Sequence, residues 1–199
     1  MIKPAATDNP GRAVRSALLA CGMALIAAGC TVVDTVWAPP LVLPCPDHKV
    51  IADLNSVTKF QDGPGRDIVD VDFEGLVLGV DLACNTDMDV EDTAGTMDVE
   101  VRLQLGAQRG PANRTRQAVM PYFISVTDRD RKVLYREDFE AVVDFEGNRT
   151  KLRFRSKPIV LELPIREGLS EKSYLIFTGL MLTKEQLKLN RTRRGGLLR

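Results

Sequence analysis

The stretch "VDVDFEGLVLGVDLAC", residues 69–84, decides the fold class. Up to Glu74 its apolar residues alternate with acidic ones, which is the pattern of a strand with one face in a core and the other in solvent. The apolar phase then slips by one residue at Gly75, and the slipped phase continues to Cys84. A slip of one residue beside a glycine predicts a β-bulge at Gly75.

Further strand patterns follow this stretch along the chain. Residues 99–105 and 139–145 alternate in the same way, and residues 119–126 are continuously apolar except for Ser125. Residues 48–54, "HKVIADL", are predicted to form the first strand. Together these segments predict an all-β domain, an immunoglobulin-like antiparallel β-sandwich of about seven to nine short strands.

A short helix is predicted at the C-terminal end. Thr183 and Gln186 have the spacing of a capping box, in which each side chain bonds the backbone amide at the other end of the first turn. The helix is expected to end near residue 190, before the basic segment "RTRRGGLLR".

The N-terminal region has the three parts of a bacterial lipoprotein signal peptide. An apolar run over residues 17–28 is too short to span a membrane, which takes about 20 residues. Small residues 27–29 precede Cys30, although the usual pattern has Leu where Ala27 stands. An ordinary secretory signal with an incidental cysteine is the alternative, and a transmembrane anchor is a weaker one. The positive charges that open the signal are Lys3, Arg12 and Arg15.

Processing of this signal would place the protein on a membrane. The sulfur of Cys30 would receive a diacylglycerol, and two or three acyl chains, at about 0.8 kcal/mol for each buried methylene, hold a protein at a bilayer. Thr31 stands where enterobacterial lipoproteins of the inner membrane carry Asp. By similarity to that sorting rule, we expect a lipid-anchored protein at the periplasmic face of the outer membrane.

The chain then divides into four parts: a signal peptide over 1–29, an acylated cysteine and proline-rich tether over 30–46, a β-sandwich over 47–190, and a basic flexible tail over 191–199. The signal holds three basic residues and one acidic residue, so 24 of 27 basic and 26 of 27 acidic residues would remain. A charge this close to neutral argues against a nucleic-acid partner, which needs a concentrated basic surface.

Two cysteines are left to form a disulfide. Cys21 would leave with the signal and Cys30 would carry lipid, so Cys45 and Cys84 can pair only with each other within the chain. The periplasm is oxidising, which favours the bond. Two free thiols are the alternative. A metal site is less favoured, because the chain has no C-x-x-C motif and its one histidine is His48.

Longer stretches resemble a family of alphaproteobacterial lipoproteins with no established activity. The resemblance lies in "CPDHKVIADLNSVTKFQDGPGRDIVDVDFEG" from residue 45, "PYFISVTDRDRKVLYREDF" from residue 121 and "GLMLTKEQLKLNR" from residue 179. It implies a lipoprotein with a β-sandwich domain and supplies no catalytic residues to assign.

Candidate catalytic and metal-binding residues each have a simpler explanation. His48 is the one imidazole base, but no nucleophile motif accompanies it, so we expect a surface histidine. Acidic residues such as Asp70, Asp72 and Glu74 are expected on the solvated face of a strand, lining no pocket. Residues 87–98, "DMDVEDTAGTMD", resemble a calcium loop but have Asp92 where an EF-hand needs Gly, so an inter-strand loop is favoured.

These observations predict no catalytic residue, cofactor or metal. We expect a membrane-anchored, non-catalytic binding or assembly module of the cell envelope, with an envelope protein as its partner. A β-sandwich without a polar pocket works through its edges and loops. The alternatives are a cell-envelope hydrolase that uses carboxylates and a carrier of a small apolar ligand. The basic C-terminal segment is expected to be a solvated tail, and the roles of this tail and of Trp37 stay open.

Overall fold

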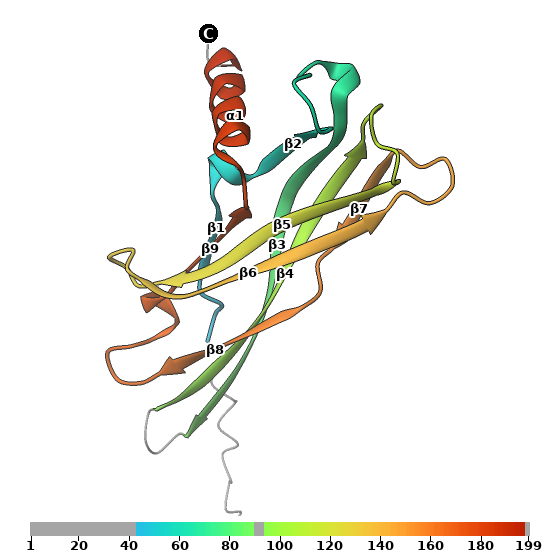
Figure 1. Cartoon of the computed structure of the whole chain (residues 1–199). Helices are drawn as coiled ribbons and strands as arrows, with labels where there is room; N and C mark the ends of the chain where they lie inside the picture. The colour runs from blue at the N-terminus through green and yellow to red at the C-terminus, as the bar shows by residue number, and fades with distance from the viewer. Residues whose placement is uncertain (1–42, 90–93, 198–199) are drawn as a thin grey trace, which may run out of the picture. The chain divides into compact units, whose positions relative to one another are not determined.

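The computed structural model describes residues 43–89 and 94–197. The chain divides into two units, and the described residues belong to the second, residues 41–199. This unit is a β-sandwich of two sheets with a helix at one end (Figure 1). The predicted lipidation site, Cys30, lies outside the described residues. So does Trp37, whose role the sequence leaves open.

Each sheet contains one pair of long neighbouring strands, β5 and β6 in sheet A and β3 and β4 in sheet B. Sheet A consists, in spatial order, of β1 (Asp47–Val50), β9 (Leu175–Leu180), β5 (Gln117–Thr127) and β6 (Val133–Asp144). Sheet B consists of β2 (Ser56–Phe60), β3 (Val71–Asp89), β4 (Ala94–Arg109) and β7 (Lys151–Arg155), with β8 (Ile159–Ile165) on β4 beyond β7. The pairings are antiparallel except that β1 and β9 run parallel, so the predicted sandwich is confirmed.

The core lies between the two sheets. The four inward-facing side chains of β4 predicted from their alternation, Val99, Val101, Leu103 and Leu105, have no exposed surface. They pack against the inward-facing side chains of β5, among them Met120 and Ile124. The apolar run over 119–126 is an interior strand because β6 and β9 flank β5 on its two sides.

The strands β3 and β4 are much longer than the short strands that we predicted. β3 has 19 residues and β4 has 16, and they pair with each other along almost their whole length. The N-terminal half of β4 pairs with β3 on one edge and with β8 on the other edge, where β8 pairs with residues 95–101. This third strand extends the sheet to the end where β3 finishes.

The predicted bulge is present, but three residues further on. The register of β3 against β4 shifts between Val77 and Gly79, so Leu78 has no partner residue. Gly75 keeps the buried phase and pairs with Ala107. It is a glycine because a β-carbon there would meet Met120 and lie 2.9 Å from Val57. The prediction of a bulge at Gly75 was therefore wrong. Position 75 is a glycine because the core leaves no room there for a side chain.

The first predicted strand is interrupted. β1 ends at Val50, and a 3-10 turn, η1 (Ala52–Leu54), leads directly into β2. The turn lies against the outer face of sheet A, where a side chain on Gly179 would collide with Leu54. The chain therefore crosses from the edge of one sheet to the edge of the other within a few residues.

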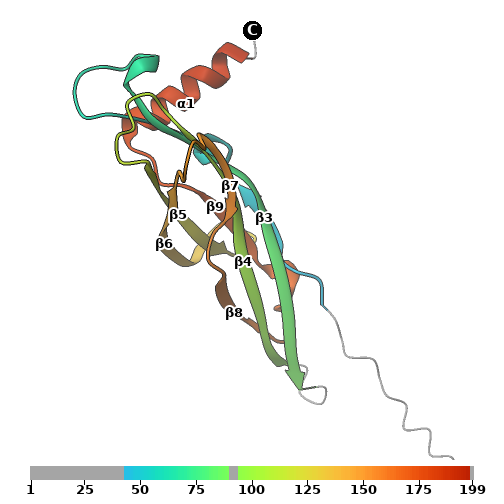
Figure 2. The same ribbon diagram turned by 90° about the vertical axis from the view of Figure 1, so that its right-hand side faces the viewer.

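The C-terminal helix α1 (Lys184–Leu197) has the predicted capping box. The backbone amide of Gln186 donates to Oγ1 of Thr183 at 3.2 Å, and the amide of Thr183 donates to Oε1 of Gln186 at 2.9 Å. The helix continues past residue 190, where we expected a tail to begin. It does so because Asn190 and Arg191 bond the η1 region, Asn190 to two carbonyls and Arg191 to the carboxylate of Asp53. α1 contacts β2 and η1. In both views it lies at the end of the sandwich away from the C-terminal end of β3 (Figure 2).

Candidate functional site

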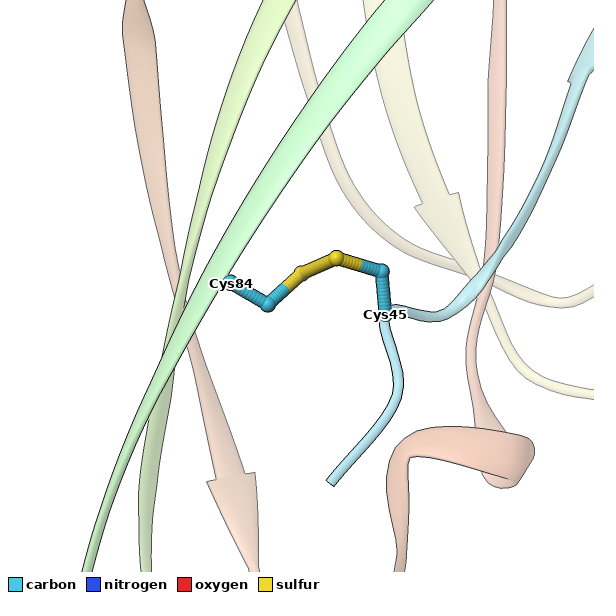
Figure 3. The surroundings of a disulfide bond; sticks show 2 residues. All are labelled: Cys45 and Cys84. Carbon is cyan, nitrogen blue, oxygen red and sulfur yellow. A yellow bond between two sulfur atoms is a disulfide. The ribbon is translucent and has the colours of Figure 1, made fainter. Parts of the chain in front are cut away.

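The predicted disulfide joins the two sheets. Cys45 and Cys84 are bonded, with Cα atoms 5.6 Å apart, the spacing expected of a disulfide (Figure 3). Cys45 lies just before β1 of sheet A, and Cys84 lies on β3 of sheet B. Any force that reaches the sandwich from the preceding chain therefore passes covalently into its longest strand.

The other sequence candidates do not assemble a catalytic or metal site. His48 is exposed on the edge strand β1, opposite Ile176. Asp87 and Asp98 lie on β3 and β4, and residues 90–93 between them are outside the described part. Over residues 43–89 and 94–197, no three His, Cys, Asp or Glu side chains are close enough together to hold a metal ion.

The carboxylates of β3 are only partly as we expected. Asp72 is half-buried and accepts a hydrogen bond from the amide of Asn113 at 2.7 Å. Glu74 faces a hollow on the outer side of sheet B, where it lies 3.7 Å from Arg193 of α1. The expectation that these residues line no pocket was wrong for Glu74, because α1 reaches across β2 and forms one wall of the hollow.

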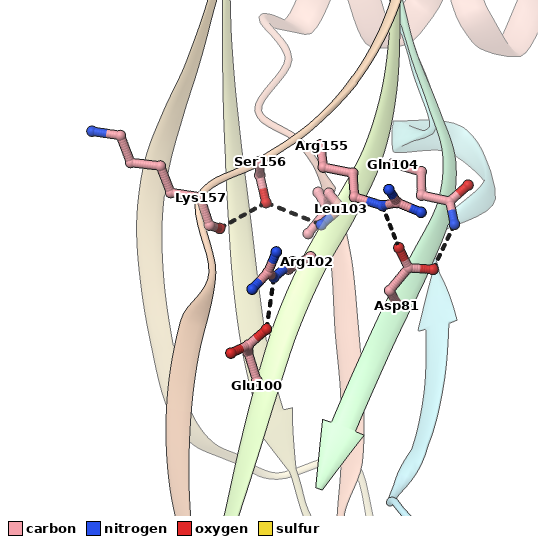
Figure 4. Close-up of polar contacts among 8 residues, drawn as sticks. All are labelled: Asp81, Glu100, Arg102, Leu103, Gln104, Arg155, Ser156 and Lys157. Atoms are coloured by element: carbon pink, nitrogen blue, oxygen red, sulfur yellow. Dashed lines mark hydrogen bonds and ion pairs between the residues drawn. The ribbon is translucent and has the colours of Figure 1, made fainter.

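Asp81 is a carboxylate with a structural role in sheet B. Asp81 accepts hydrogen bonds from Gln104 at 2.5 Å and from Arg155 at 2.9 Å (Figure 4). These bonds, that from Gln104 first, hold the pKa of Asp81 below its ordinary value. Nearby, Ser156 accepts from the amide of Leu103 at 3.0 Å and fixes the bend between β7 and β8. The cluster ties β3, β4 and β7 together across sheet B.

An apolar hollow lies on the outer face of sheet A, and we call it the sheet A groove. Its volume is about 490 Å³. Its floor is β5, where Ser125 lies between Phe123 and Thr127, and the small serine leaves the depression. Phe177 of β9 lies beside Ser125 in the register. The lining residues also include Ile51, Leu54, Val133, Leu180, Met181 and Leu182.

Arginine side chains border the groove on the side of β6. The guanidinium of Arg136 lies over the Phe123 ring, 4.2 Å from its centre, and is paired with Asp138. Arg131 is held in a tight turn, because its backbone amide donates to the carbonyl of Asp128 at 3.1 Å. Arg131 forms no ion pair with any described residue. The groove therefore combines an apolar floor with one arginine charge that is not neutralised by an ion pair.

Two apolar side chains at the rim are exposed to solvent. Val133 is 57% exposed and Met181 is 37% exposed, on opposite sides of the floor. The inward faces of the two sheets are by contrast filled with fully buried side chains, so this apolar hollow lies outside the sandwich. A binding surface of this kind suits a protein segment laid across the sheet.

Sequence reasoning missed this groove, although one signal pointed to it. Ser125 is the single polar residue in an otherwise apolar run. Its hydroxyl donates to the carbonyl of Tyr135 at 3.1 Å, so the buried hydroxyl has a hydrogen-bond partner on the outer face of the strand. The remaining lining residues lie in three other segments, residues 51–54, 131–136 and 177–182, which only the folded chain brings together.

Comparisons with known proteins found no similar one. A scan against models of protein families, a search of curated proteins and a search of solved structures each gave no match. Among the described residues, no helix has the length and apolar character needed to cross a membrane.

Proposed function

We propose that the protein is a lipid-anchored, non-catalytic binding module of the cell envelope. Cys30 holds it at the periplasmic face of the outer membrane, and the sheet A groove binds a segment of an envelope protein. The observation that supports the proposal is an apolar hollow with two exposed rim residues and one arginine, Arg131, that forms no ion pair with the residues described by the structure. An exposed apolar patch of this kind on a sheet is typical of interaction sites.

The chemistry of the groove describes its partner. Aliphatic or aromatic side chains would cover Phe177, Val133 and Met181, and a carboxylate would pair with Arg131. The partner is therefore an apolar segment with an acidic residue at one end. Binding would bury Val133 and Met181, which is a favourable change, at about 25 cal/mol for each Å² of apolar surface removed from water.

The tether limits where this groove works. Cys30 lies fifteen residues before Cys45, and an extended chain covers at most about 3.6 Å per residue, so the disulfide would stay within about 54 Å of the lipid anchor. The partner would thus be another component of the same membrane or one that reaches it from the periplasm.

Two experiments test the two halves of the proposal. For the anchor, Cys30→Ala should abolish fatty-acid labelling and release the protein from the membrane, and unchanged labelling would exclude it. For the groove, a photo-crosslinking amino acid replaces Val133 in cells, and the same replacement at Val160 serves as control, since Val160 is 61% exposed but lies on β8.

We expect a discrete crosslinked envelope protein from position 133 and not from position 160. Arg131→Glu should remove that adduct, because it places a negative charge beside the partner's carboxylate. Equal adducts from both positions, or an adduct that survives Arg131→Glu, would contradict the groove as the binding site.

A further inference from the structure

The strands β6 and β7 each leave one edge unpaired. β6 is the last strand of sheet A, and β7 is the last strand of sheet B beside residues 104–108 of β4. Within the described residues, β6 pairs only with β5 and β7 pairs only with β4. The connection over residues 145–150 leads directly from one to the other, so both edges lie on the same side of the sandwich (Figure 1).

The two edges carry opposite charges on their outer faces. On β7 the outward side chains are the exposed cations Lys151, Arg153 and Arg155, while Leu152 and Phe154 point into the core. On the last part of β6 the outward side chains are exposed and acidic or apolar: Glu140, Val142 and Asp144. The inward side chains between them are Ala141 and Val143, which contact the core.

Most of these charges have no ion-pair partner in the described part of the chain. Lys151, Arg153 and Glu140 form no ion pair there, and the carboxylate of Asp144 accepts only from the neutral amide of Gln117, at 3.0 Å. Arg155 is the exception, since it is paired with Asp81 at 2.9 Å. Charged edges of this kind resist random strand addition, so an added strand must carry the opposite charges.

We propose that the edge of β7 is filled by β6 of a second copy of this chain. One antiparallel register pairs opposite charges on the outer face and apolar residues on the inner face, with Val142 opposite Arg153 between the two charge pairs. It sets Asp144 opposite Lys151 and Glu140 opposite Arg155 on the outer face. On the inner face it sets Val143 opposite Leu152 and Ala141 opposite Phe154. Directly opposed charges and apolar pairs of this kind each stabilise a β-ladder by a few tenths of a kcal/mol to about 1 kcal/mol.

The same geometry closes the assembly at two copies. Because both edges lie on one side of the sandwich, a twofold axis that brings β6 of one copy to β7 of the other also makes the reciprocal pairing. The interface is then the same patch on both copies, and no edge of this pair remains for a third. The sheet A groove uses the other half of β6 and the face of the sheet, so both surfaces can be occupied together.

Charge reversal and recombination test the pairing. One variant has the charge on the β6 edge reversed, Asp144→Arg, and the other has the facing charge on the β7 edge reversed, Lys151→Glu. Both positions are exposed, so both variants should keep the Cys45–Cys84 disulfide and the β-sheet circular dichroism of the native chain. The full-length chain in detergent is followed by sedimentation over a range of concentration and salt.

We expect the native chain to be a dimer that weakens as salt is raised, and each variant alone to dimerise at least ten-fold more weakly. A one-to-one mixture of the two variants should recover the dimer, because each then offers the charges that the other lacks. A native monomer at every concentration, a dimer that both variants retain, or a mixture that stays monomeric would each overturn the proposal, the last favouring a foreign strand as the occupant.

Cysteine pairs test the register itself. Chains with Val142→Cys mixed with chains with Arg153→Cys should form a disulfide-linked heterodimer on mild oxidation, since the two positions face each other in the proposed ladder. Chains with Val142→Cys mixed with chains with Val160→Cys should not. Equal linkage in both mixtures would overturn the register.

Discussion

Replacing Gly75 by alanine is expected to destabilise the sandwich, because the new methyl group has no room. Gly75 lies on the inner face of β3, where a β-carbon would meet the sulfur of Met120 and lie 2.9 Å from Cγ1 of Val57. Met120 has no exposed surface, so it cannot turn out into solvent to make space. Either the core shifts or Met120 leaves its preferred rotamer.

The magnitude follows from two opposing effects. Over-packing of a core costs about 1–3 kcal/mol. Alanine also restricts the unfolded chain, which stabilises the fold by about 0.4–1 kcal/mol where the backbone angles suit it, and Gly75 does not have a left-handed backbone angle. We therefore expect Gly75→Ala to lower the free energy of unfolding by about 1–2 kcal/mol.

Gly106 provides the matched control. It lies on β4, opposite Leu76, but on the outer face of the same sheet. A β-carbon there would lie 3.5 Å from Cδ1 of Leu78, which is an ordinary contact. Gly106→Ala should thus be neutral or stabilise the fold by up to about 1 kcal/mol.

Urea denaturation of the oxidised protein measures both variants. The midpoint of Gly75→Ala should fall and that of Gly106→Ala should hold or rise, with unchanged dependence on urea. If Gly75→Ala proves as stable as Gly106→Ala, the assignment of Gly75 to the core and of the bulge to Leu78 would be refuted.

Three further changes test other parts of the structure. Cys84→Ser, or reduction of the native protein, should cost about 4 kcal/mol in the free energy of unfolding, as expected for closing a loop of this length; chemical denaturation with and without reductant would show no difference if the bond were dispensable. Asn190→Ala removes two hydrogen bonds from the side-chain amide to backbone carbonyls and should lower the free energy of unfolding by about 1–3 kcal/mol. Faster amide exchange in α1 is the direct readout, and unchanged exchange would mean that the helix docks without this residue. Hydrogen bonds lower the pKa of Asp81 in the folded protein, so its carboxylate stabilises the fold above the ordinary pKa of 3.8, and this contribution is lost as the pH falls through the lowered pKa. Asp81→Asn should therefore have a lower free energy of unfolding than the native chain at pH 7 and approach the native value in acid. A difference between the two proteins that does not depend on pH would contradict the role assigned to this carboxylate.

The strands were predictable where one face of a strand is buried and the other is not. Val99 to Leu105 alternate because β4 has β3 beside it and the core on one face, so burial and sequence follow the same period. The bulge was misplaced because residues 76–78 are all apolar. Such a run is compatible with a slip at any of its positions, and only the packing against Met120 decides between them.

Features that depend on contacts between distant segments were out of reach. The length of α1 is one case, since "RTRR" shows no apolar face and is held by polar bonds to η1 and β2. β2 is another, because its five residues precede a turn-rich segment and their partner strand begins eleven residues after Phe60. Four separate segments line the sheet A groove. The one feature of the groove that the sequence shows is Ser125, the single polar residue in the apolar run over 119–126.

The proposed pairing also fixes how two anchored copies would stand. β6 runs toward the 145–150 connection and β7 runs away from it, so the two strands are opposite in direction within one chain (Figure 1). An antiparallel ladder between β6 of one copy and β7 of the other therefore leaves the second copy's strands pointing the same way as the first's. The twofold axis must then run along the strands, and both copies present Cys45 at the same end of the dimer. Two lipid anchors could thus enter one membrane, where each would raise the effective concentration of the other. A parallel ladder would instead place the two Cys45 residues at opposite ends, which a pair of chains anchored in a single membrane through short tethers cannot satisfy.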